Sequence, residues 1–446
     1  MSQVKTITMG GVPEGFDARI VLDEVARTTG PVVHVARDDK RLAAMAAALG
    51  FFDPSVPVLT FPGWDCLPYD RVSPNSAILA ARMATLAALS AAPARAQVIL
   101  TTLSAATQYV PAGTTLAGAS FVAEVGGRID EDGLRAFLTR MGYAQSPTVT
   151  EPGDYAIRGG IIDLWPPGEA GPVRLDLFGD VLDGARRFDP VSQRTTEQLS
   201  RIELAPMSEI VLDETAITRF RQNYRVEFGA AGTDDPLYEA VSAGRKHAGM
   251  EHWLPFFHDR LDTLFDHVPD ATVTLDQQNA AQRQARWDQI AEQYAARREA
   301  MAVRDRIATV YKPVPPEALY LDDGAWAAAL RDRRVLSFHP LPQAPGPGLV
   351  DAGGRVGRDF APERQQEEIS LFGALADHVK KAAQTGPVVI ASFSDGARER
   401  LAGLLSDEGL GDLRDVARAS DLGGPGSVAL AVWPLEEGFT GGGLTV

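Results

Sequence analysis

GGVPEGFD, residues 10–17, keeps the glycine spacing of the phosphate-binding loop G-x-x-x-x-G-K-[ST], with Gly10 and Gly15 at the two glycine positions. Phe16 stands where that loop has its lysine, and Asp17 stands where it has the hydroxyl that binds Mg²⁺. Phenylalanine supplies no charge, and a carboxylate repels phosphate oxygens. The stretch therefore predicts the scaffold of a nucleotide-binding α/β domain without its chemistry.

A second segment indicates the same scaffold. ATVTLDQQ, residues 271–278, predicts a buried strand that ends in the acid Asp276, as a Walker B segment does. Gln277 follows where a hydrolytic glutamate is expected, and an amide cannot act as a carboxylate base. Each signal alone also fits an ordinary turn or strand end, but their order along the chain favours a degenerate nucleotide site.

Bulk properties narrow the class of protein. The 446 residues predict about three domains. The net charge of −16 disfavours a free-standing duplex-DNA binder, which usually carries a basic surface. Cys66 is the single cysteine, so no disulfide forms within the chain, and the histidines show no metal-ligand spacing. Without an apolar leader or a long apolar span, the expected location is the cytoplasm, with no membrane partner.

Strand and helix patterns alternate over residues 1–120, which predicts a parallel α/β sheet. From residue 121 to 204, short alternating segments are separated by Gly, Pro and Asp, which predicts a compact α+β insert. The α/β pattern returns over residues 205–315. Residues 316–356 are rich in Pro and Gly and predict a linker, and residues 357–446 predict a further small α/β domain.

The insert also carries a long and specific string of residues. It contains GDYAIRGGIIDLWP at 153–166, RLDLFGD at 174–180 and FDPVSQRT at 188–195. This string resembles domain 2 of the UvrB-like module of nucleotide-excision repair, as found in the N-terminal part of transcription-repair coupling factors (Mfd). Further matches, WDCLPYD at 64–70 and GMEHWLPFF at 249–257, extend the resemblance over nearly the whole chain.

The resemblance implies a domain order of 1a, 2, 1b and 3, corresponding to the four folded segments above. In the family, an RNA-polymerase-binding domain and an ATP- and Mg²⁺-dependent DNA translocase motor follow, so we expect this chain to be a fragment that itself uses no cofactor. UvrB carries a long aromatic-rich hairpin insertion near residues 70–76, and this chain runs straight into a helix there. Gripping of damaged DNA is therefore not expected.

Domain 2 of the family binds UvrA, and the resemblance places that surface on Arg158, Arg174, Phe178, Asp180 and, with less support, Arg194. Alternation along residues 174–178 puts Arg174 and Phe178 on one face of a strand. Arginine beside an aromatic residue is typical of interface hot spots. The alternative is that Arg174 pairs with Asp176, or Arg158 with Asp154, while Phe178 lies in the core.

Three functions remain open. The first is a non-catalytic adaptor that recruits UvrA to stalled RNA polymerase and, in the whole family protein, restrains the motor domains that it packs against. The second is an ATP-dependent damage-binding helicase module of the UvrB type, against which Phe16, Asp17 and Gln277 argue. A third possibility is a purely structural α/β domain with no external partner.

Overall fold

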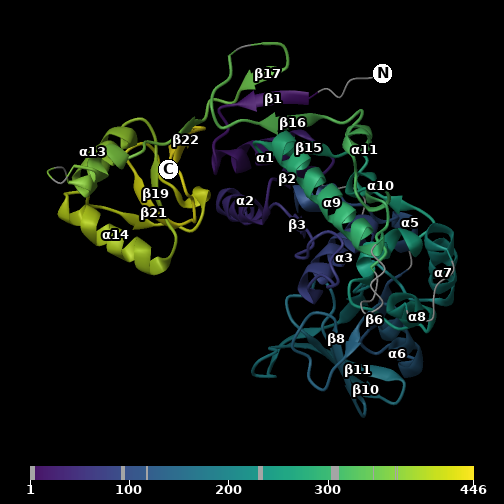
Figure 1. Ribbon diagram of the computed structural model, residues 1–446. Helices are drawn as coiled ribbons and strands as arrows, with labels where there is room; N and C mark the ends of the chain where they lie inside the picture. Colours follow the sequence, from purple (N-terminus) through teal and green to yellow (C-terminus); the bar gives the residue numbers. More distant parts are fainter. Residues whose placement is uncertain are drawn as a thin grey trace.

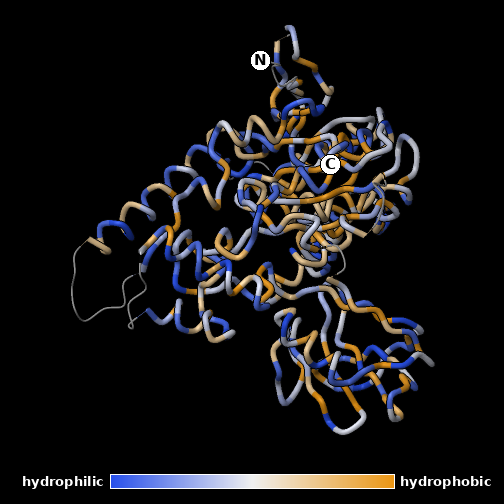
Figure 2. Tube along the Cα trace, turned by 90° about the vertical axis from the view of Figure 1, so that its right-hand side faces the viewer, coloured by the Kyte–Doolittle hydropathy of each residue, from blue (hydrophilic) through white to orange (hydrophobic). Residues whose placement is uncertain are grey.

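The computed structural model describes residues 6–91, 96–116, 119–229, 235–302, 311–344, 346–366, 368 and 370–446. Figure 1 shows a central α/β body, a second body below it built from residues of the insert, and a third body formed by the C-terminal residues. In Figure 2, hydrophobic residues are concentrated in the interior of the larger body. The fold class is α/β, as the sequence predicts.

The central body is built on a seven-stranded sheet in the order β17-β1-β16-β15-β2-β4-β3, in which every neighbouring pair is parallel. Strands β2, β4 and β15 are buried throughout, as expected for parallel strands covered on both faces. The bounds of the strands are β1 (Thr6–Gly10), β2 (Val32–Ala36), β3 (Val58–Phe61), β4 (Val98–Thr102), β15 (Thr272–Leu275), β16 (Val335–Phe338) and β17 (Leu349–Asp351).

Helices surround this sheet. The N-terminus of α2 is fixed by Asp38, whose side chain accepts a hydrogen bond from the backbone N–H of Arg41. Long helix α9 is mostly polar and exposed, as its sequence predicts, and it crosses the sheet in Figure 1. The helices around the sheet are α1 (Phe16–Arg27), α2 (Asp39–Phe52), α3 (Ser76–Ala91), α4 (Leu103–Ala106), α5 (Gly113–Leu116), α9 (Asn279–Ala302), α10 (Pro316–Leu319) and α11 (Asp323–Ala329).

The linker prediction for residues 316–356 is wrong. This stretch supplies α10, α11, β16 and β17, and β16 lies inside the large sheet between β1 and β15. The Pro- and Gly-rich residues form the connection between β16 and β17 instead. The error has a physical reason: β16 is only four residues long, and its alternation is too short to stand out beside the prolines that follow it.

The insert forms a six-stranded sheet in the order β12-β11-β10-β9-β8-β7, with β6 and β13 paired separately. One face of this sheet packs with α6 around a buried cluster that includes Tyr155, Ile162, Leu164 and Leu175. The bounds are β6 (Phe121–Glu124), α6 (Glu131–Arg140), β7 (Ala144–Gln145), β8 (Asp154–Arg158), β9 (Ile161–Leu164), β10 (Val173–Phe178), β11 (Val181–Phe188), β12 (Thr195–Leu199) and β13 (Arg201–Leu204).

Between the insert and the return to the large sheet, an aromatic cluster joins several short elements to α9. Phe220 of α7 stacks on Phe257, with ring centroids 4.8 Å apart. The elements of this region are α7 (Glu214–Phe228), α8 (Pro236–Ser242), the 3₁₀ helices η1 (Met250–Phe256) and η2 (Leu264–His267), and the two-residue strands β5 (Val110–Pro111) and β14 (Leu261–Asp262), which pair with each other.

The C-terminal body has its own six-stranded sheet in the order β18-β22-β23-β19-β21-β20. It is attached to the central body through Trp433, which stacks on Phe51 of α2 at a centroid separation of 4.4 Å. Its elements are β18 (Arg355–Val356), α12 (Ala361–Arg364), α13 (Leu371–Ala383), β19 (Val388–Ser392), α14 (Asp395–Asp407), β20 (Arg414–Asp415), η3 (Ala419–Asp421), β21 (Val428–Val432), β22 (Phe439–Gly441) and β23 (Leu444–Thr445).

Candidate functional site

The glycine loop lies where a phosphate-binding loop is expected, between β1 and α1. Gly10 ends β1, and Gly15, with a φ of 84°, directly precedes α1. A Cβ atom on Gly15 would lie 2.8 Å from the ring of Phe439, and one on Gly11 would lie 2.7 Å from the carbonyl oxygen of Gly354. These glycines are therefore required by the close approach of other segments of the chain to the loop.

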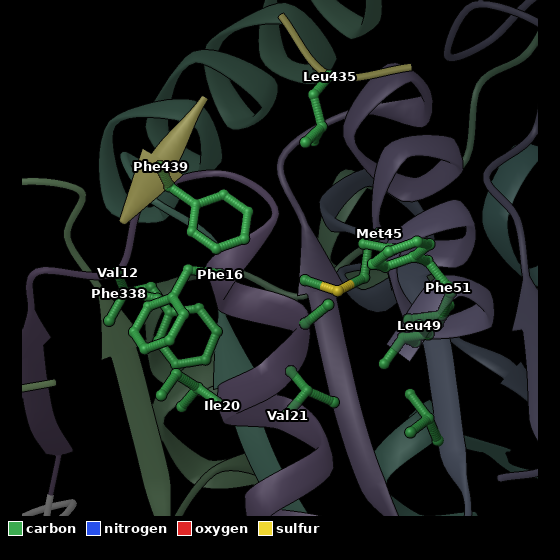
Figure 3. Close-up of a cluster of buried hydrophobic side chains, with 14 of the residues drawn as sticks. Val12, Phe16, Ile20, Val21, Met45, Leu49, Phe51, Phe338, Leu435 and Phe439 are labelled. Atoms are coloured by element: carbon green, nitrogen blue, oxygen red, sulfur yellow. The ribbon is translucent and has the colours of Figure 1, made fainter. Parts of the chain in front are cut away.

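Phe16, at the lysine position, belongs to the hydrophobic core. It is 3% exposed, and its ring lies 5.9 Å from that of Phe439 in the C-terminal body. Figure 3 shows Phe16 among side chains of the loop, of β16 and of β22, with Leu435 and Met45 in the same cluster. Phe16, which stands where the phosphate-binding lysine is expected, thus also anchors the C-terminal body over the loop.

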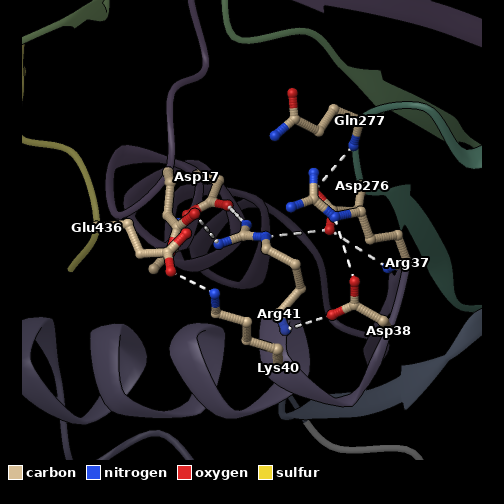
Figure 4. A network of polar contacts seen from close by, with 10 residues as sticks. Asp17, Arg37, Asp38, Lys40, Arg41, Asp276, Gln277 and Glu436 are labelled. Carbon is tan, nitrogen blue, oxygen red and sulfur yellow. Dashed lines mark hydrogen bonds and ion pairs between the residues drawn. The ribbon is translucent and has the colours of Figure 1, made fainter. Parts of the chain in front are cut away.

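The two acids of the degenerate site meet at one buried arginine, Arg41 of α2. Its guanidinium contacts Asp17, lies 3.2 Å from Oδ2 of Asp276 and lies 3.1 Å from Oε2 of Glu14. The side chains of Arg41 and the two aspartates are each 3% or 4% exposed. Figure 4 shows the guanidinium between the carboxylates. A covalently attached cation therefore lies between the two acids predicted to mark the nucleotide site.

Burial and charge act together in this network. Burial raises the pKa of Asp17 to about 6, although the nearby Arg41 guanidinium acts in the opposite direction. Burial alone would lower the pKa of Arg41, but the attraction of Asp17, Asp276 and Glu14 outweighs it and raises that pKa. Arg41 thus stays charged at every pH at which the protein is folded.

Gln277 joins this network only through its backbone, and its side chain points away from the Arg41 guanidinium in Figure 4. Its backbone N–H donates to Oδ1 of Asp276 at 2.8 Å, which helps to fix that carboxylate. Sequence reasoning missed Arg41. One signal was available: two acids at one site require a cation when they are buried, and Arg41 lies shortly after β2, the strand next to β15.

His34, in β2 beside this network, makes stability depend on pH. Burial lowers its pKa to about 4, against 6.5 for an exposed histidine. The unfolded chain therefore binds more protons between pH 6.5 and 4, so this contribution to stability is complete above pH 6.5 and decreases as the pH falls. At pH 5 we expect a loss of about 2 kcal/mol from this residue.

Urea unfolding at pH 7 and pH 5 checks this expectation. Asp17 acts in the opposite direction, because its raised pKa favours the folded state more at pH 5 than at pH 7. The measurement is therefore a comparison of the wild type with His34→Gln, in which the contribution of Asp17 is the same. The variant should lose less stability on acidification, and equal losses would contradict the expectation.

The predicted UvrA surface lies on the face of the insert sheet opposite α6. Asp163 of β9 is 2% exposed and accepts two hydrogen bonds from Arg174, at 2.6 and 2.9 Å. Arg158 of β8 reaches the same carboxylate at 3.5 Å, with 57% of its side chain exposed. Arg174 also stacks on Phe188, 4.7 Å from the ring centre. One buried carboxylate thus holds both arginines against the sheet.

Phe178 is not in the core. It is 82% exposed at the end of β10, and the neighbouring Ile161 is 41% exposed. Asp180 follows in the turn and pairs with Arg128 at 3.5 Å, and Arg194 is exposed in the loop before β12. The exposed side chains of Arg158, Ile161 and Phe178, together with the half-buried Arg174, form a surface of cationic and apolar groups, here called the insert face.

The alternative ion pairs are also not formed. Asp176 contacts Arg186 of β11 rather than Arg174. The side chain of Asp154 accepts hydrogen bonds from the backbone N–H groups of Thr150 and Glu151 instead of pairing with Arg158. Sequence reasoning missed Asp163, the residue that organises the two arginines, because a single acid in a hydrophobic strand gives no sign of its cross-strand partner.

A parallel sheet with a phosphate-loop-like turn, interrupted by an inserted and mostly antiparallel sheet, defines a UvrB-like α/β protein. Residues 121–210 match the family model of the UvrB interaction domain. The chain is 29% identical over 410 residues to the transcription-repair-coupling factor of Haemophilus influenzae, covering 89% of this chain and 34% of that protein. It is 31% identical over 394 residues to that of Escherichia coli K12, covering 87% and 33%.

A third relative, the transcription-repair-coupling factor of Myxococcus xanthus, is 36% identical over 258 residues, which cover 54% of this chain and 21% of that protein. The chain is therefore related to the N-terminal, UvrB-like region of the transcription-repair-coupling factors, which confirms the resemblance. It matches about one third of the length of the first two relatives.

Two further observations concern other classes of site. Among the residues that the structure describes, no helix is long and apolar enough to cross a membrane. Within the same residues, no group of three His, Cys, Asp or Glu side chains is placed to hold a metal ion.

Proposed function

We propose that this chain is a non-catalytic adaptor in transcription-coupled repair, which binds UvrA through the insert face. The observation that carries the proposal is the exposure of Phe178 and Arg158 on one face of the region that matches the UvrB interaction domain. An exposed phenylalanine beside an arginine is favourable for an interface, because both residue types are enriched among hot spots. Asp163 supports this role by fixing the arginines before a partner arrives.

The adaptor is proposed to use no nucleotide. Arg41 lies between Asp17 and Asp276, and Phe16 packs where a lysine would contact phosphate. A bound Mg²⁺-nucleotide would have to displace a buried guanidinium and expose a hydrophobic cluster. No observation favours the alternative of an ATP-dependent helicase module, and saturable binding of Mg-ATP would support that alternative.

The remaining parts of the proposal rest on the resemblance to the transcription-repair coupling factors. Recruitment of UvrA to stalled RNA polymerase, contacts with duplex DNA through other domains, and restraint of a translocase motor are properties expected of a whole coupling factor. In that context the insert face would be masked until polymerase is engaged, which is a shift between two populated states.

Binding to UvrA tests the proposal. We expect the chain to co-elute with UvrA in size-exclusion chromatography. In calorimetry, Arg158→Ala and Phe178→Ala should each weaken the affinity by about 2 kcal/mol, or about thirtyfold, if they are central anchors.

Matched controls are available for both substitutions. Phe393→Ala removes a phenylalanine that is 67% exposed in the C-terminal body, and Arg19→Ala removes an arginine that is 54% exposed on α1. Neither should change the affinity for UvrA. Unchanged binding by folded Arg158→Ala and Phe178→Ala would reject the insert face as the UvrA site, and failure of the wild type to co-elute would reject the adaptor itself.

A further inference from the structure

A polar pocket of about 370 Å³ lies between α9 and the carboxyl ends of two central strands. Arg37 enters it just after β2, and Ser104 enters it from α4, which follows β4 directly. The opposite wall is formed by α9, with Gln282, Arg286 and Gln289. Open parallel sheets bind their ligands at this position, outside the carboxyl ends of the strands.

The charged residues that line the pocket are all positive. Its lining contains two arginines and no carboxylate. Arg37 has a weak contact with Asp38, whose side chain is 52% exposed, at 3.4 Å. Arg286 donates to the amide oxygen of Gln289 at 2.7 Å, and its Nε atom is buried without a hydrogen-bond partner among the residues that the structure describes.

Arg286 is half-buried, and it differs from the fully buried Arg41 and Arg82 in having no carboxylate partner among the described residues. Arg41 contacts three carboxylates, and Arg82 lies 2.7 Å from the buried Glu209. Arg286 makes no ion pair within the described part of the chain, and burial lowers its pKa. A guanidinium remains protonated even so. The Arg286 guanidinium lies 6.0 Å from the ring centre of Tyr320, but no carboxylate of the described residues pairs with it, so the pocket holds a positive charge that lacks an anion.

We propose that this pocket binds a phosphate-type oxyanion between Arg37 and Arg286. Two guanidinium groups supply charge-assisted hydrogen bonds in the geometry that phosphate oxygens accept. The Ser104 hydroxyl and the amides of Gln282 and Gln289 supply neutral donors. Its volume lies near the lower end of the range for small-molecule sites, so it accommodates more than a single phosphate. The phosphate belongs either to the backbone of a single-stranded nucleic acid or to a free phosphate compound.

This pocket is separate from the degenerate nucleotide site. The side chain of Arg41 points into the cluster of Asp17 and Asp276, whereas Arg37 joins that cluster only through its backbone N–H, 3.3 Å from Asp276. The inference is also independent of the insert face, which lies on another sheet. Loss of UvrA binding and loss of anion binding are therefore distinguishable results.

The test uses the full chain with two probes, pyrophosphate in calorimetry and fluorescein-labelled dT12 in fluorescence anisotropy. We expect at least one probe to bind in a saturable manner. Tighter binding of dT12, with displacement by pyrophosphate, identifies a nucleic-acid backbone as the source. Binding of pyrophosphate alone identifies a free phosphate compound. Arg37→Gln and Arg286→Gln should each lower the affinity about tenfold, since each removes one charge-assisted contact.

The control is Arg298→Gln, which removes the same charge from an exposed position on the same helix and should leave the affinity unchanged. A stability measurement separates a binding role from a structural one. Without any ligand, Arg286→Gln should have a Tm at least equal to that of the wild type, because it removes a partly buried charge that has no carboxylate partner among the described residues. Absence of binding by both probes at millimolar concentration, equal affinities for wild type and both pocket variants, or a lowered Tm of Arg286→Gln would each overturn the proposal.

Discussion

Replacing Arg41 with alanine is expected to destabilise the protein by about 3–5 kcal/mol, because it leaves carboxylates buried without their counter-ion. Asp17 and Asp276 are almost fully buried, and Glu14 contributes a third negative charge. Repulsion among these acids adds to the loss of hydrogen bonds. Urea unfolding followed by circular dichroism measures the change in the free energy of unfolding.

Two comparisons make this result specific. Arg19→Ala breaks an exposed pair with Asp23 on α1 and should change the stability by less than about 1 kcal/mol. Asp17→Asn combined with Arg41→Ala should recover part of the loss, since the amide is neutral and the two sites are in contact. An Arg41→Ala variant as stable as the wild type would show that the guanidinium does not balance the buried acids.

Restoring the lysine of the phosphate-binding loop, in the variant Phe16→Lys, is expected to destabilise the protein without creating a nucleotide site. Phe16 packs against Phe439 and is 3% exposed, so the substitution removes a buried ring and places an ammonium group in an apolar cluster. The expected loss is about 4 kcal/mol, from the lost burial and the cost of desolvating the charge. Calorimetric titration with Mg-ATP should show no saturable binding.

The controls separate charge, size and position. Phe16→Leu keeps the site apolar and should cost about 1 kcal/mol. Phe393→Lys introduces the same charge at an exposed phenylalanine and should change the stability by less than about 0.5 kcal/mol. Tight binding of Mg-ATP by a stable Phe16→Lys variant would contradict the proposal that Arg41 and the C-terminal body occupy the position of the nucleotide.

The strands that form the centre of the fold could be predicted from sequence, because parallel strands covered on both faces have continuous apolar runs such as those of β2 and β4. The short strands β16 and β17 could not. Their place is determined by pairing with β1, more than 300 residues away in sequence, and four residues carry too little pattern to reveal a long-range partner. The boundaries of the four domains otherwise stay a prediction.

For the candidate sites, the sequence predicted the helix and strands that carry the functional residues, but not the charged residues that pair with them. The positions of Gly15, Phe16 and Asp276 relative to their helix and strand followed from motif spacing. The roles of Arg41 and Asp163 did not, because each acts through partners on other elements; Arg41 belongs to no quoted motif, and the motif that contains Asp163 does not show that it pairs with two arginines. The exposure of Phe178 could not be decided from alternation alone, since both faces of a sheet can be covered.

The guanidinium of Arg41 has a consequence for energy transduction. A nucleotide site cycles because its occupant is exchanged, so that the charge between the two acids rises and falls with each turnover. Here the cation between the two acids is part of the polypeptide and cannot be exchanged. On the proposal that this chain uses no nucleotide, the energy that moves this region comes from contacts with other macromolecules rather than from a reaction at this site.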